Sequence, residues 1–169
     1  DAQTLQAKII LSGTVTKASP ATASANVGQA IVFRSAPNVT YSNGANRTVT
    51  YTLRTTSSAT STVLRTWTTN PGVQQTAFTS PSRDLSYTPV VLADAVAGQV
   101  CRYLHWSYPD PLTGVVTTGY TSLCVPINKP AMNVTGTLTS NITEASLTKA
   151  ITLTSAPNVT YSYAANSPV

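Results

Sequence analysis

The two cysteines of this chain flank a segment that folds back on itself. Cys101 and Cys124 lie on either side of Pro109–Gly114, and such a cluster of Pro, Asp and Gly predicts a turn. An antiparallel ribbon closed by that turn sets Cys101 opposite Cys124, at a separation that a disulfide can span. The same register sets Trp106 opposite Gly119, where the indole ring restores the packing that a glycine lacks. The sequence therefore predicts a β-hairpin closed by a disulfide.

A metal pair or a thiol nucleophile is the alternative role for these cysteines. Zinc sites use three or four ligands at close spacing, whereas the chain has one histidine, His105. We therefore favour the disulfide. Because disulfides form in oxidising compartments, we expect an extracellular or cell-surface location.

The composition favours strands over helices. The chain has 30 Thr and 18 Ser, and only 9% of its residues are charged; Thr and Val are stiff at χ1 and fit a pleated sheet. Runs of these residues between Gly, Pro, Asn and Ser clusters predict seven strands, near residues 5–16, 29–34, 48–55, 62–68, 84–93, 99–108 and 115–127. We expect an all-β fold for residues 1–128, an antiparallel two-sheet sandwich of immunoglobulin or fibronectin type III kind.

An internal repeat divides the chain. The octapeptide Ser35–Ser42 recurs unchanged as Ser155–Ser162, an offset of 120 residues, and Leu11–Thr16 resembles Val134–Thr139. A period of this length matches whole all-β domains in tandem. We expect a linker at residues 129–130 and the N-terminal portion of a second, similar repeat at residues 131–169.

Residues 131–169 are too few to bury a core alone. They are either truncated from a longer repeat protein or complete a sheet in a neighbouring copy by strand exchange, which would give a homo-polymer. We favour truncation, because an unpaired half-sandwich would expose its strand edges.

Two further segments carry a resemblance to a known family. Ala18–Gln29 and Thr48–Thr52 resemble the opening of DUF11-type and related immunoglobulin-like repeats of bacterial surface proteins, with their Ser-Pro start, Val-Gly-Gln turn and Thr-Val-Thr-Tyr strand. The resemblance covers about a quarter of the first unit, and the cysteine hairpin departs from it. It implies a stalk or adhesive module outside a cell, with neighbouring repeats as partners and no catalytic residues.

Other classes of function find little support. The five acidic residues are dispersed and no nucleophile, phosphate or metal motif occurs, so we expect neither an enzyme nor a cofactor or metal. The formal charge of +5 is spread thinly, which argues against nucleic acid. No apolar run reaches 18 residues, so we expect no membrane span.

The hairpin also predicts a candidate binding face. Alternate strand residues share a face, so Tyr103, His105 and Tyr120 should lie beside the disulfide, with Leu104 and Trp106 on the opposite, core side. Exposed aromatic rings grip sugars and proteins, which suggests a glycan or a cell-surface protein as partner. Ordinary cross-strand pairing on a solvated sheet is the alternative.

Two covalent modifications are also considered. Sequons for glycosylation occur at Asn38, Asn46, Asn133, Asn141 and Asn158, and we expect Asn38 and Asn158 to serve in turns after proline. An isopeptide crosslink between Lys8 and Asn128 would need a buried, protonated acid such as Asp94.

Together these features predict a secreted or cell-surface structural or adhesive repeat that spaces its neighbours or presents a binding face. The alternatives are a carbohydrate-binding module of a secreted enzyme and a fibre subunit that assembles by strand exchange.

Overall fold

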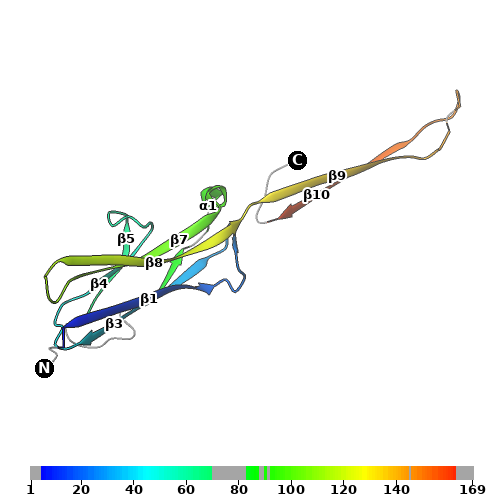
Figure 1. Ribbon diagram of the computed structural model, residues 1–169. Coiled ribbons are helices and arrows are strands. Elements are labelled where there is room, and N and C mark those ends of the chain that lie inside the picture. The colour runs from blue at the N-terminus through cyan, green and yellow to red at the C-terminus, as the bar shows by residue number, and fades with distance from the viewer. Residues whose placement is uncertain (1–4, 70–82, 88–89, 91, 145, 163–169) are drawn as a thin grey trace.

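The computed structural model describes residues 5–69, 83–87, 90, 92–144 and 146–162 (Figure 1). Over these residues the chain forms ten strands and one short helix, α1 (Leu92–Ala97). The strands are β1 (Lys8–Ser19), β2 (Ala25–Asn26), β3 (Ile31–Ser42), β4 (Thr50–Arg54), β5 (Val63–Thr68), β6 (Asp84–Tyr87), β7 (Gln99–Pro109), β8 (Val116–Asn128), β9 (Ala131–Ser140) and β10 (Leu153–Ser162). The all-β prediction is confirmed, and each of the seven predicted strands overlaps an observed one.

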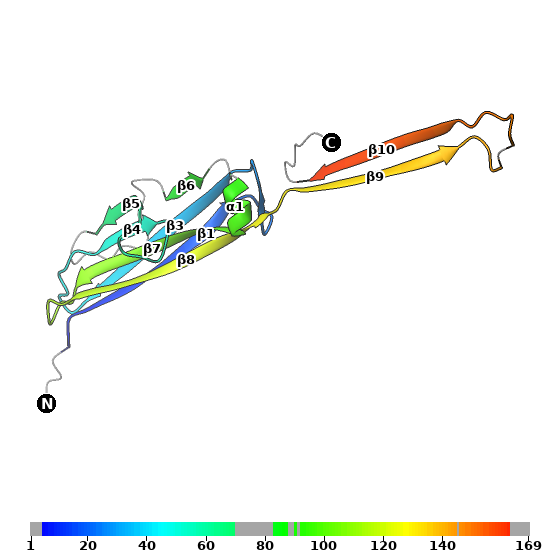
Figure 2. The same ribbon diagram turned by 90° about the horizontal axis from the view of Figure 1, so that it is seen from above.

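Two sheets form the body of the molecule (Figures 1 and 2). One has the strand order β1-β3-β6 and the other the order β2-β8-β7-β4-β5. Paired strands are antiparallel, except that β2 runs parallel to β8. The inward side chains of both sheets share one core, in which Ile31, Phe33, Tyr51, Leu53 and Leu104 are fully buried.

Tyr51 ties the two sheets together by polar contacts as well as by packing. Its hydroxyl donates towards the carbonyl oxygens of Ser12 on β1, at 3.0 Å, and Asn38 on β3, at 2.6 Å. Burial raises the pKa of this phenol, so the hydroxyl keeps its proton. The tyrosine therefore satisfies its own polar atom inside the core.

The β7–β8 hairpin has the predicted register. Cys101 pairs with Cys124 and Trp106 with Gly119, and a Cβ added at Gly119 would stand 2.6 Å from the Trp106 ring. At the tip, the carboxylate of Asp110 accepts hydrogen bonds from the backbone N–H groups of Leu112 and Thr113. These bonds lower the pKa of Asp110 and fix the turn.

Strand β3 is longer than predicted. It continues through Pro37 to Ser42 instead of ending near Arg34. The backbone N–H of Ser35 bonds to Arg83 beside β6, so the nitrogen of Pro37, two residues later, points to the same side. Among the residues that the structure describes, β6 pairs with β3 as far as Arg34, so Pro37 interrupts no ladder hydrogen bond described there.

The predicted strand near residues 84–93 is too long at its C-terminal end. Strand β6 ends at Tyr87, and the short helix α1 follows. Its Leu-Ala-Asp-Ala-Val-Ala sequence contains good helix formers. Gly98, at φ 82°, ends the helix with its N–H bonded to the carbonyl of Asp94, as expected of a glycine C-cap.

Strands β9 and β10 form a separate two-stranded ribbon that projects from the body (Figures 1 and 2). Lys129 and Pro130 alone lie between β8 and β9. Most of the ribbon's side chains are exposed. In its register Gly136 pairs with Pro157, just as Gly13 pairs with Pro37 between β1 and β3.

Candidate binding face

Three aromatic rings gather on the outer face of the five-stranded sheet. Tyr103 and His105 project from β7, and Tyr120 projects from the neighbouring strand β8. The ring centroids of Tyr103 and Tyr120 are 5.7 Å apart, and those of His105 and Tyr120 are 5.2 Å apart. The structure thus brings together the three residues that the sequence placed on one face; their role in binding stays a prediction.

A shallow groove runs beside these rings. It has a volume of about 530 Å³ and is lined on one side by Thr50, Thr52 and Arg54 of β4, and on the other by His105 and Tyr120. Ser57 and Ala59, in the loop between β4 and β5, also line it. Hydroxyl, guanidinium and imidazole groups beside aromatic rings offer both hydrogen bonds and stacking, which suits a polyhydroxylated ligand.

His105 is held in place by the loop that borders the groove. Its Nε2 lies 3.1 Å from the carbonyl oxygen of Thr56. Because a carbonyl only accepts, this contact assigns the hydrogen to Nε2. The ring is therefore a positioned donor to the loop, with its other nitrogen free to accept in the neutral form.

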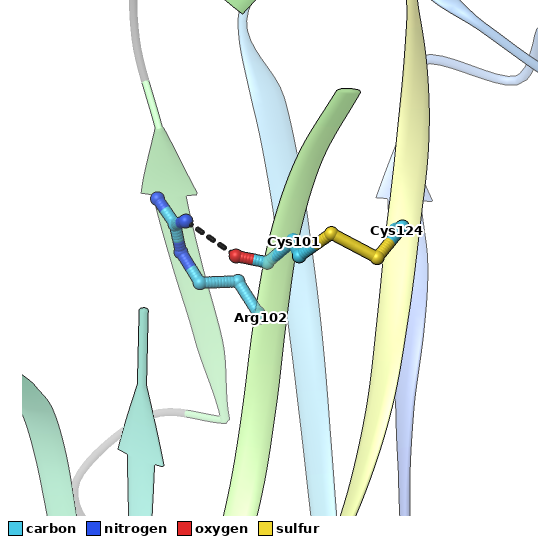
Figure 3. Close-up of a disulfide and its surroundings, with 3 residues drawn as sticks. All are labelled: Cys101, Arg102 and Cys124. Carbon is cyan, nitrogen blue, oxygen red and sulfur yellow. Dashed lines mark hydrogen bonds between the residues drawn. A yellow bond between two sulfur atoms is a disulfide. The ribbon is translucent and has the colours of Figure 1, made fainter. Parts of the chain in front are cut away.

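The disulfide joins β7 and β8 on the same outer face (Figure 3). The sulfur atoms of Cys101 and Cys124 are 2.02 Å apart and their Cα atoms 4.0 Å apart, so the predicted bond is confirmed. It connects the strands that carry the three rings. The two strands are thereby fixed in the register on which the aromatic cluster depends.

Arg102 is a buried charge that the sequence reading missed. Only 7% of the residue is exposed, and its guanidinium carbon lies 5.1 Å and 4.8 Å from the ring centroids of Phe33 and Tyr87. One nitrogen donates to the carbonyl of Cys101, at 2.7 Å (Figure 3). Burial lowers the pKa of this guanidinium. The sequence signal for this burial was its position between Val100 and Leu104. Side chains alternate in direction along a strand, so these three share the inward face of β7.

The predicted isopeptide residues lie apart. Lys8 pairs with Ser42 at one end of the β1–β3 pair, whereas Asn128 pairs with Asn26 and donates its side-chain amide to that residue, at 2.6 Å. Strand β1 extends over 12 residues from Lys8, so roughly 35 Å separates its ends. Asp94, on α1, accepts a hydrogen bond from Tyr87. Lys8 is exposed on β1 and the Asn128 amide is bonded to Asn26, so no contact in this fold supports the crosslink considered from the sequence.

The five sequons occupy different environments. Asn38 is half-buried within β3, while Asn46, Asn133, Asn141 and Asn158 are exposed. The expectation that Asn38 and Asn158 lie in turns is wrong, because both lie within strands, β3 and β10. Glycosylation at these sequons, which we expect to be mostly incidental, is untested, and the four exposed asparagines offer the accessible amides.

Comparison with known proteins adds no name to this site. No protein-family model matches the chain, and no curated protein matches its sequence significantly. Within the described residues, no group of three His, Cys, Asp or Glu side chains forms a potential metal site. No helix in that part of the chain is long and apolar enough to cross a membrane.

Proposed function

We propose that this protein is a non-catalytic structural module of a secreted or cell-surface repeat protein, which spaces neighbouring units and presents an outer binding face. The observation that carries the proposal is the repeated strand pair: β9 and β10 copy the register of β1 and β3. Units of the same build joined by Lys129 and Pro130 would follow one another in series, as in a stalk.

The strand order supports an immunoglobulin-like arrangement of the first unit. The first strand lies in one sheet, while the short strand β2 lies parallel to the last strand of the other sheet. Strands β4, β7 and β8 are then equivalent to the central strands C, F and G of that fold. One departure is that the disulfide links two neighbours in one sheet instead of joining the two sheets.

The disulfide also supports a location outside the cell. Cytosolic thiols are kept reduced, whereas secreted and surface proteins keep such bonds. Closing a loop of 23 residues stabilises the folded state by about 3 kcal/mol in the chain-entropy model. A sandwich with a sparsely charged surface gains from such a bond when it is exposed to proteases.

Single-molecule pulling on the full chain tests the mechanical role. We expect one cooperative unfolding event for the first unit, because β1 and β8 span its length (Figure 1). The 23-residue loop behind the disulfide stays closed, so reduction should add about 75 Å to the extension at roughly 3.4 Å per residue.

The matched control is the chain with Cys101→Ser and Cys124→Ser, which should show the longer extension without reductant. Gradual lengthening without a force peak would contradict a mechanical module.

The groove beside the aromatic rings favours a second candidate, binding of a carbohydrate. A panel of soluble polysaccharides should then bind the full chain, and the double change Tyr103→Ala with Tyr120→Ala should abolish binding. Tyr161→Ala, on the ribbon, is the control for an exposed tyrosine elsewhere. Unchanged binding in the double variant would remove the groove from the function.

A further inference from the structure

The ribbon of β9 and β10 has the same pairing as β1 and β3, residue for residue. Ile9 pairs with Tyr41 and Leu11 with Val39; at the equivalent positions Met132 pairs with Tyr161 and Val134 with Val159. The face of β1 and β3 that carries these residues lies against the five-stranded sheet. The contacts made there indicate which side chains of a covering sheet would pack on the same face of the ribbon.

Two contacts define that face in the first unit. The Tyr51 hydroxyl donates towards the carbonyls of Ser12 and Asn38, and Leu104 packs over Gly13. A Cβ added at Gly13 would stand 2.9 Å from Leu104 Cδ2. A side chain at position 13 would therefore have to displace the buried Leu104 of the covering sheet, whereas glycine leaves room for it.

On the ribbon the equivalent face is open. Met132, Val134 and Leu138 are exposed, Leu138 by 69%, and neither strand places a charged residue on this face. A Cβ added at Gly136 would meet nothing closer than 3.6 Å. The ribbon by itself therefore does not need glycine there, although the position equivalent to Gly13 keeps it.

We infer that this face is covered by the polypeptide that follows β10, folded as a sheet equivalent to β4, β7 and β8. In that sheet a tyrosine hydroxyl donates to the carbonyls of Thr135 and Asn158, the equivalents of Ser12 and Asn38. An apolar side chain lies over Gly136. The inference deepens the proposed repeat function and rests on it.

The sequence after β10 favours this source over a second copy of the chain. At the same offset of 120 residues, Ala165 and Val169 match Ala45 and Val49, which are buried in the first unit just before β4. In a second copy the sheet is already covered by its own β1 and β3. Those strands belong to the same chain as the sheet and are therefore present at a high effective concentration. A ribbon from another molecule would have to displace them.

An extended chain tests the inference. Val169 matches Val49, so a copy of Thr50–Asn128 is appended directly after Val169 of the full chain. We expect a second cooperative unfolding transition. We also expect slow amide hydrogen exchange at Val134 and Leu138, which should exchange quickly in the chain that ends at Val169 because the ribbon lacks a covering sheet.

Gly136→Ala is the decisive variant. In the 169-residue chain it should leave stability unchanged, whereas in the extended chain it should lower the midpoint of the second transition by about 5 °C or more, because a Cβ overpacks the interface. Gly13→Ala is the matched control and should lower the first transition in both chains.

Three results from these two chains would overturn the inference. The ribbon could remain unprotected in the extended chain, or Gly136→Ala could leave the second transition unchanged. The 169-residue chain could also protect the ribbon in a dimer that forms with rising concentration, which would assign the face to a second copy.

In the extended chain, a variant with Met132→Ile, Val134→Leu, Leu138→Val and Leu153→Phe carries the residues of β1 and β3 at these positions. If the second unfolding transition appeared with this variant and not with the ribbon's own residues, the inference would also be overturned, because the ribbon's own side chains would not fit the covering sheet. All these results leave the first transition and its response to pulling intact, so a failure here is distinct from a failure of the proposed function.

Discussion

The β1–β3 pair and the β9–β10 ribbon have one register and opposite burial. Val15, on β1, is 7% exposed, whereas its equivalent Leu138 is 69% exposed. The flanking backbone pairs are the same, including glycine opposite proline. The difference between the two regions is the five-stranded sheet, which covers the first and not the second.

This comparison separates two determinants of a β-protein. Register follows from local sequence, since the alternating pattern and the shared octapeptide set it in both regions. Burial follows from residues elsewhere in the chain, here from β4, β7 and β8. Hydrophobic stabilisation therefore differs greatly between two strand pairs that are almost alike.

The sharpest way to test the comparison is to truncate equivalent residues. Phe33→Ala removes a fully buried ring and should cost about 3–5 kcal/mol of unfolding free energy. Leu153→Ala, at the equivalent position and 61% exposed, should stay within about 0.5 kcal/mol. Urea unfolding of both variants measures the difference. A cost above about 1 kcal/mol for Leu153→Ala would mean that the ribbon is covered in solution.

Reduction of the disulfide should have the next largest effect, and only in the body. Opening the Cys101–Cys124 bond should lower the unfolding free energy of the first unit by about 3 kcal/mol. Amide exchange in β9 and β10 should not change, because the bond lies within β7 and β8. Urea titration and hydrogen exchange, each with and without reductant, provide the two measurements. Loosening of the ribbon by reductant would contradict the separation of the two regions.

Tyr51→Phe tests the polar link between the sheets. Removing the hydroxyl of this fully buried side chain takes a donor from the carbonyls of Ser12 and Asn38 and should cost about 1–2 kcal/mol. Tyr120→Phe, at a tyrosine that is 50% exposed on β8, is the control and should be neutral. Urea midpoints compare the two variants. Equal effects would show that the Tyr51 hydrogen bonds contribute nothing beyond packing.

Low pH should destabilise the first unit and not the ribbon, and this should be the smallest of these effects. Arg34 on β3 forms a two-pronged ion pair with Asp84 of β6, and this lowers the pKa of Asp84 below its ordinary 3.8. A depressed carboxyl pKa gives stability that is present above the unfolded pKa and is lost as pH falls through the folded value. We therefore expect the first unit to weaken below about pH 4.

Asp84→Asn should flatten that decline, as followed by thermal unfolding between pH 7 and pH 2. The ribbon has Thr154 in place of Arg34 and should not respond. An unchanged acid profile in Asp84→Asn would assign the decline to other carboxyl groups.

The sequence was sufficient for features that depend on local pattern. The disulfide, the contact of Trp106 with Gly119 and the approximate places of seven strands follow from alternation and turn residues. The grouping of Tyr103, His105 and Tyr120 follows from the same register. These predictions hold because a hairpin is fixed by neighbours in the chain.

Features that depend on distant segments were missed. Pro37 lies within β3, and the side to which its nitrogen points depends on the partner strands β1 and β6, which residues near Pro37 do not reveal. The end-to-end separation of Lys8 and Asn128 depends on the length and direction of whole strands. The groove needs the loop after β4 to meet β7, and no periodicity encodes that meeting.

Pro157 has a consequence for the open ribbon. Like Pro37, it sits opposite a glycine in a paired strand. The N–H of Asn141 bonds to the carbonyl of Thr152, and since successive residues of a strand alternate in direction, the nitrogen of Pro157 points away from β9. The outer side of β10 thus lacks one N–H, so a strand from another chain that paired with this edge would lose one hydrogen bond of the ladder. Edge-to-edge pairing of the ribbon with unrelated chains is therefore less favourable, even while the face that the covering sheet would occupy is open.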